Sequence, residues 1–113
     1  MSGPPYSPVF RAGEWSCISG QLGITPDGLA EGFAAQTEQL FINLNLLLQK
    51  HELSVDQIAK TTVFLADMAD YAELNEAYSA FFGDHRPARS AVAVAGLPFG
   101  ALIEMEAWVY TGT

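Results

Sequence analysis

Two charged side chains near the C-terminal end of the chain have the chemistry to act together on a small organic acid. Arg89 precedes an apolar run, and Glu104 lies in the next apolar segment. A guanidinium binds a carboxylate through two parallel hydrogen bonds, and Pro87 restricts the chain that presents it. An unpaired carboxylate among apolar neighbours is costly, so Glu104 must have a reason to lie there.

Each of these residues also has a purely structural interpretation. Arg89 paired with Glu104 or Asp84 would serve stability alone, and so would a salt bridge of Glu104 across a subunit interface. Glu106 fits a solvated edge position or a similar pair. A carboxylate in apolar surroundings is paired, hydrogen-bonded or functional, and the residue pattern leaves these alternatives open.

The strands that carry these residues indicate contact with a second chain. Alternation in the predicted strand Leu102–Tyr110 places Glu104 and Glu106 on the face opposite Ile103, Met105, Ala107 and Val109. The predicted strand Ser90–Ala95 is apolar or small on both faces, whereas a sheet covered by helices on one side should be polar on the other. We therefore expect a homo-oligomer with both glutamates near a subunit contact.

The rest of the chain predicts one α+β domain over residues 1–113, with two helices on one face of a sheet. Apolar spacing of three and four indicates a helix over Gly32–His51, and Asp70 with Glu73 predicts a capping box that opens a second helix, closed by Gly83. The expected order is β-β-α-β-α-β-β. The remaining predictions are a hairpin over Val9–Leu22, a turn at Thr25–Gly28, a strand at Ile58–Leu65 and a loop at Gly96–Gly100.

Composition restricts the possible partners and the compartment. The net charge is −8 with only 5 Lys and Arg residues, which disfavours binding to nucleic acid. The single cysteine, Cys17, excludes a disulfide framework within the chain, fits the reducing cytoplasm and is expected to be a buried structural thiol. The N-terminus does not have the pattern of a signal peptide, and no apolar stretch has membrane-spanning length.

The segment PARSAVAVAGLPFGALIEMEA resembles the signature of the RidA/YjgF family of reactive intermediate deaminases, also labelled endoribonuclease L-PSP. Three further segments agree with this resemblance, which spans Tyr6 to Tyr110: ISGQL, KTTVFLADMADYAELNEAY and AFF. The resemblance implies a chorismate-mutase-like fold with a mixed sheet. It also implies a homotrimer whose sheets form a central barrel, with clefts between subunits.

The resemblance implies an activity as well. Members hydrolyse enamine and imine acids released by pyridoxal-phosphate enzymes to 2-keto acids and ammonia, with no metal or organic cofactor. Arg89 would bind the substrate carboxylate, and Glu104 would hold the attacking water. Tyr6 would close the cleft, Ser19 and Gly20 would line it, and Asn75 would help to order it.

Departures from the family pattern keep other functions open. Ala91 stands where some members have cysteine, Phe99 where many have lysine, and the loop before Arg89 is shorter. A non-catalytic protein that binds a keto acid or related metabolite is therefore the alternative to a deaminase. An endoribonuclease is a further alternative that the negative charge disfavours. His85 and Arg86 are interpreted as solvated loop residues.

Overall fold

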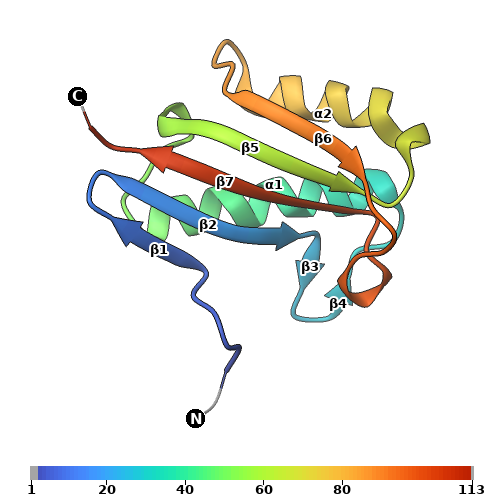
Figure 1. The fold of residues 1–113 in the computed structure, drawn as a ribbon. Coiled ribbons are helices and arrows are strands. Elements are labelled where there is room, and N and C mark those ends of the chain that lie inside the picture. The colour runs from blue at the N-terminus through green and yellow to red at the C-terminus, as the bar shows by residue number, and fades with distance from the viewer. Residues whose placement is uncertain (1–2, 113) are drawn as a thin grey trace.

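A computed structural model describes residues 3–112 as a five-stranded sheet with both long helices on one of its faces (Figure 1). The strands of this sheet are β1 (Val9–Ala12), β2 (Trp15–Leu22), β5 (Ile58–Leu65), β6 (Ala88–Ala93) and β7 (Ile103–Tyr110). The helices are α1 (Phe33–Lys50) and α2 (Tyr71–Phe82), and a small separate hairpin consists of β3 (Ile24–Thr25) and β4 (Gly28–Leu29). Neither helix has the length and apolarity that a membrane crossing requires.

The strand order is β1-β2-β7-β5-β6, and the sheet is mixed. Only β5 and β6 pair in parallel, because α2 connects them as a crossover; the other neighbours are antiparallel. The predicted α+β class with two helices on one face is confirmed. Three short 3-10 turns complete the chain, at Val55–Gln57, Met68–Asp70 and Pro98–Gly100.

The core forms between the helices and one face of the sheet, as alternation in the last strand predicts. Ile103, Met105, Ala107 and Val109 are each at most 2% exposed. They meet the apolar stripe of α1, where Leu44 is 1% exposed. The residues between them in β7 point to the other face, which no helix covers (Figure 1).

The predicted capping box at the start of α2 is wrong. The side chain of Asp70 makes no capping hydrogen bond, because a 3-10 turn precedes the helix and moves the cap upstream. There the Asp67 carboxylate accepts a hydrogen bond from the backbone N–H of Ala69 at 2.9 Å. Gly83 ends the helix as predicted, with a left-handed φ of 62°.

Two further boundaries differ from the prediction. The strand expected at Ser90–Ala95 is β6, Ala88–Ala93, because its pairing with β5 begins where Ala88 meets Lys60. The turn at Thr25–Gly28 is present, but it joins two strands of two residues each that the predicted order lacks.

The uncovered face of the sheet exposes large apolar side chains. Phe10 is 64% exposed, Val92 44% and Trp108 43%. The predicted apolar far face is therefore present in the single chain. Cys17 lies on this face between Phe10 and Trp108 and is only half-buried in the single chain, so the predicted burial of this structural thiol is not complete there.

Candidate functional site

A bulge in β2 brings backbone close to the Glu104 side chain. Ile18 pairs with Ala107 and Gln21 with Met105, so β2 has one residue more than β7 over this interval. The bulge contains Ser19 and Gly20. A Cβ atom added to Gly20 would collide with the Glu104 carboxylate in its observed position, so this flexible end of the side chain would have to move.

The same bulge holds the N-terminal segment against the sheet. The Ser19 hydroxyl donates a hydrogen bond to the Ser7 carbonyl at 2.7 Å, and the Ser19 N–H donates to the Pro8 carbonyl at 3.0 Å. These bonds place Tyr6 beside β2 although its side chain is 63% exposed. The result is an open cavity of about 390 Å³, lined by Tyr6, Ser19, Gly20, Pro98, Glu104 and Glu106.

The Glu104 carboxylate in this cavity holds its proton more tightly than a free glutamate. Burial raises the pKa of Glu104, and the negative charge of Glu106 raises that pKa further. The two residues are two apart in β7 and therefore share the uncovered face of the sheet. A carboxylate with a raised pKa in an open cavity suits the acceptance and return of a proton.

Arg89 lies on the other face of the sheet. It pairs in register with Thr61, which is 0% exposed beneath the helices. Its Nη2 donates a hydrogen bond to the Tyr71 hydroxyl at 3.1 Å, and its Cζ lies 4.7 Å from the centre of the Tyr78 ring. The Tyr78 hydroxyl is in turn 2.7 Å from the Thr61 hydroxyl, so a buried pair fixes the ring under the guanidinium.

Two tyrosines, and no acidic side chain, hold Arg89. Within residues 3–112 the structure records no ion pair between Arg89 and a carboxylate. The structural alternative in which Arg89 pairs with Glu104 or Asp84 of its own chain is therefore wrong. Most of the N–H donors of the guanidinium therefore remain free to bind an anion.

The six predicted site residues fall into two groups. Tyr6, Ser19, Gly20 and Glu104 share the cavity. Asn75 is half-buried on α2, four residues after Tyr71 and three before Tyr78, so it shares the helix face that holds Arg89. Glu104 pairs with Phe64, three residues from Thr61 in β5, which puts the two groups on opposite faces of the sheet.

Sequence reasoning missed four residues that complete these groups. Pro98 and Glu106 line the cavity, and Tyr71 and Tyr78 hold the guanidinium. The alternation of β7 places Glu106 on the same face as Glu104, and this pattern was visible in the sequence. Tyr71 and Tyr78 are seven residues apart with Asn75 between them, a spacing that places all three on one face of a helix.

Neither group includes His85, in the loop before Arg89, or Phe99, in the loop before β7. A ring nitrogen of His85 is 2.6 Å from the Ile58 carbonyl, which makes this histidine a structural tie and not the solvated loop residue expected. Phe99 is 77% exposed beside Pro98 and has a left-handed φ of 60°, a strained conformation for an aromatic residue.

Comparison with known proteins shows the family of the chain. The profile of the family described as Endoribonuclease L-PSP matches residues 2–111. Protein HMF1 of Saccharomyces cerevisiae is 42% identical over 104 residues, which are 90% of this chain and 81% of that protein. The 2-iminobutanoate/2-iminopropanoate deaminase of Salmonella typhimurium is 40% identical over 108 residues, 91% of this chain and 84% of that protein.

A solved structure shows the same fold. The crystal structure of RidA from the Antarctic bacterium Psychrobacter sp. PAMC 21119 superposes with a TM-score of 0.91 at 39% sequence identity. The match covers 97% of this chain and 91% of that one. On the family profile, these relatives and this superposition, the chain belongs to the RidA/YjgF family, whose profile is named Endoribonuclease L-PSP.

Proposed function

We propose that this protein is a deaminase that hydrolyses 2-imino acids and their enamine tautomers to 2-keto acids and ammonia. Relatives from Salmonella typhimurium and Mus musculus, 40% and 36% identical, carry the name 2-iminobutanoate/2-iminopropanoate deaminase. A relative from Arabidopsis thaliana, 38% identical, is named Reactive Intermediate Deaminase A. Shared family and moderate identity support the same class of reaction here.

One observation carries the proposal: each chain presents two incomplete halves of a site. One half contains the Glu104 cavity, and the other contains a guanidinium that has no carboxylate partner among residues 3–112 of its own chain. Because the halves lie on opposite faces of the sheet, Arg89 of one copy would meet Glu104 of a neighbouring copy. The complete site would therefore lie between subunits.

The chemistry needs little more than these groups. Arg89 would bind the substrate carboxylate in a bidentate manner, which orients the imine carbon. Glu104 would accept a proton from a water molecule while the water oxygen bonds to the imine carbon and the C=N electron pair moves to nitrogen. Return of that proton to nitrogen completes a carbinolamine. The carbinolamine hydroxyl then gives up its proton, which passes through Glu104 to nitrogen, and the C=O bond forms as the C–N bond breaks and ammonia leaves.

The uncovered sheet face supports association with further copies. It exposes Phe10, Val92 and Trp108, which an isolated chain would leave in contact with water. We infer that this face packs on other copies in a homotrimer with a central barrel. In that assembly the cavity beside Glu104 would become a closed cleft.

A complementation experiment tests the site directly. Arg89→Ala and Glu104→Gln are each expected to lose most activity on freshly generated 2-iminobutanoate while remaining folded. Co-expressed in equal amounts, the two inactive chains should recover about a quarter of wild-type activity, because random assembly places an intact Arg89 opposite an intact Glu104 at about that fraction of sites.

Three results would contradict the proposal. If Arg89→Ala deaminates as well as the wild type, the guanidinium has no catalytic role. If both single variants are inactive and no mixture recovers activity, each site lies within one chain. A wild-type protein that binds 2-ketobutyrate at Arg89 but hydrolyses no imine would instead be the non-catalytic metabolite-binding protein.

A further inference from the structure

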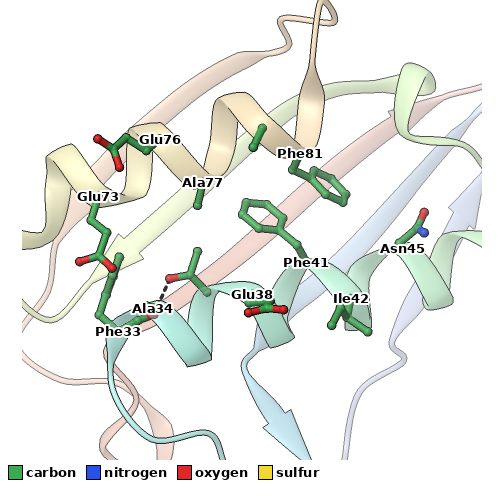
Figure 2. Close-up of a pocket in the computed structure, with 12 residues that line it drawn as sticks. Phe33, Ala34, Glu38, Phe41, Ile42, Asn45, Glu73, Glu76, Ala77 and Phe81 are labelled. Atoms are coloured by element: carbon green, nitrogen blue, oxygen red, sulfur yellow. Dashed lines mark hydrogen bonds between the residues drawn. The ribbon is translucent and has the colours of Figure 1, made fainter.

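A groove on the outer side of the helix layer has the shape and charge of a docking surface, independently of the proposed reaction. It lies between α1 and α2, has a volume of about 610 Å³, and contains none of the residues of the two half-sites (Figure 2). The uncovered sheet face is on the opposite side of the molecule (Figure 1). In the proposed assembly other copies would contact that face and the Arg89 half-site, and the groove contains none of the residues named for either.

The floor of the groove is apolar and firmly packed. The rings of Phe41 and Phe81 stack with centroids 4.4 Å apart and planes 18° apart, one from each helix. Ala77 of α2 lies beside them and occupies little volume (Figure 2). Ala80 of α2 also lines the groove with a small side chain. Ile42 of α1 also lines the groove and is 45% exposed, so an apolar partner would cover a side chain that now faces water.

The rim of the groove carries one sign of charge. Glu38 projects from α1, and Glu73 and Glu76 project from α2, all three with exposed side chains (Figure 2). All Lys and Arg residues of the chain belong to the described range, and none of them lines the groove. A partner with positive charge on both flanks of an apolar strip is therefore complementary to it.

The dimensions match a short helix. The lining residues of α1 run from Phe33 to Asn45, which corresponds to about 18 Å along the helix axis, or about three turns. We propose that the groove binds an amphipathic helical segment of another protein, with apolar residues at i, i+4 and i+7 on the aromatic floor and Lys or Arg beside Glu38, Glu73 and Glu76. A second copy of this chain is a poor occupant, because its net charge of −8 repels the rim.

The test uses a labelled, alanine-based helical peptide of about 14 residues, with Leu at i, i+4 and i+7 flanked by Lys. Fluorescence anisotropy with the full chain should show binding that weakens as salt increases. Ala80→Trp fills the groove from an exposed position and should weaken binding by about tenfold or more. Glu73→Gln with Glu76→Gln should weaken it by about three- to tenfold at low salt.

Matched controls separate the groove from general charge attraction. Asp27→Asn with Asp56→Asn removes two exposed charges outside the groove and should leave the affinity close to that of the wild type. A peptide with Glu in place of each Lys should bind at least about tenfold more weakly than the Lys peptide.

Four outcomes would overturn the proposal. The first three are the absence of binding at millimolar peptide, equal affinity for the Lys and Glu peptides, and wild-type affinity in both groove variants. Self-association of the protein that Ala80→Trp abolishes would identify a second copy as the occupant and would equally contradict a foreign helix.

Discussion

At the scale of single residues, the most informative side chain is Arg89. Most partly buried arginines pair with a carboxylate, but here the guanidinium lies against Tyr78 and donates to the Tyr71 hydroxyl. Aromatic faces attract a cation without neutralising its charge. The positive charge therefore stays available to a negatively charged ligand, and the rings still restrict where the guanidinium can move.

The Tyr71 hydroxyl should influence substrate binding through Arg89. Tyr71→Phe removes one hydrogen bond to a charged group and keeps the ring, a loss of about 1 kcal/mol or about fivefold in affinity. We expect KM for 2-iminobutanoate to rise by about that factor with kcat nearly unchanged. Unchanged kinetics in a normally folded variant would show that this contact does not position the guanidinium.

The Glu104 carboxylate should lower the stability of the fold near neutral pH, although the proposed reaction requires it. Burial and the charge of Glu106 raise the pKa of Glu104 in the folded chain. The protonated side chain therefore contributes stability that is fully present below the pKa of a free glutamate. This contribution is lost as the pH rises through the pKa of the folded state. Glu104→Gln should therefore have a higher Tm than the wild type near neutral pH, at equal protein concentration, while losing activity.

The Tm difference should shrink as pH falls below the ordinary glutamate pKa of about 4.3. Scanning calorimetry of both proteins across this range measures it. A Gln variant that is less stable than wild type at neutral pH would mean that the Glu104 carboxylate makes favourable ionic contacts in the assembly.

At the scale of elements, patterns repeated along the chain were predictable and single local contacts were not. Alternation over Ile103–Val109 and the apolar stripe of α1 each average over many residues, and both predictions are confirmed. The start of α2 depends on one carboxylate, and an unforeseen 3-10 turn passes that role from Asp70 to Asp67. The β2 bulge was equally unforeseen, because it depends on the register with β7.

The position of the cap can be checked by two matched substitutions. Asp67→Ala removes the hydrogen bond to the Ala69 N–H and should lower the free energy of unfolding by about 1 kcal/mol. Asp70→Ala should lower it by less than about 0.5 kcal/mol, because the Asp70 side chain makes no capping bond. Urea unfolding of both variants measures the two losses of free energy. A larger loss for Asp70→Ala than for Asp67→Ala would show that Asp70 caps the helix after all.

Gly20 gives a prediction on the bulge. Gly20→Ala places a methyl group against the Glu104 carboxylate, the flexible end of that side chain, and should displace the carboxylate from its observed position with little loss of stability. Gly96→Ala is the control, since nothing lies within 4 Å of an added Cβ there. Deaminase activity should fall markedly in the first variant and persist in the second; equal activity in both would show that the close approach is unimportant.

At the scale of the whole molecule, the sheet separates the residues that the proposed reaction must unite. The sequence motif contains both Arg89 and Glu104, but only the strand registers show that their side chains point to opposite faces of the sheet. Sequence reasoning could name candidate site residues by resemblance and expect an oligomer from the apolar far face. It could not divide the residues between two half-sites, because side-chain direction across strands depends on pairing partners distant in the chain.

The assembly itself gives a prediction. Trp108→Asp puts a charge on the uncovered sheet face, where the side chain is 43% exposed in the single chain. We expect this variant to sediment as a folded species near 12.2 kDa without deaminase activity, although it keeps both catalytic groups.

Leu46→Asp, at a position 58% exposed on α1, is the control and should leave the assembly and the activity unchanged. A Trp108→Asp monomer that still hydrolyses imines would contradict a shared site. A trimer that persists in this variant would place the interface elsewhere.

The opposite-facing placement of the two half-sites has a genetic consequence. If every cleft draws one group from each of two neighbours, a chain that lacks both Arg89 and Glu104 disables two clefts of any ring that it enters. In a cell that expresses equal amounts of normal and doubly defective chains, only about a quarter of clefts would be intact, below the half that independent sites would leave. Such an allele would behave as a dominant-negative one, and its severity would report how freely the subunits mix.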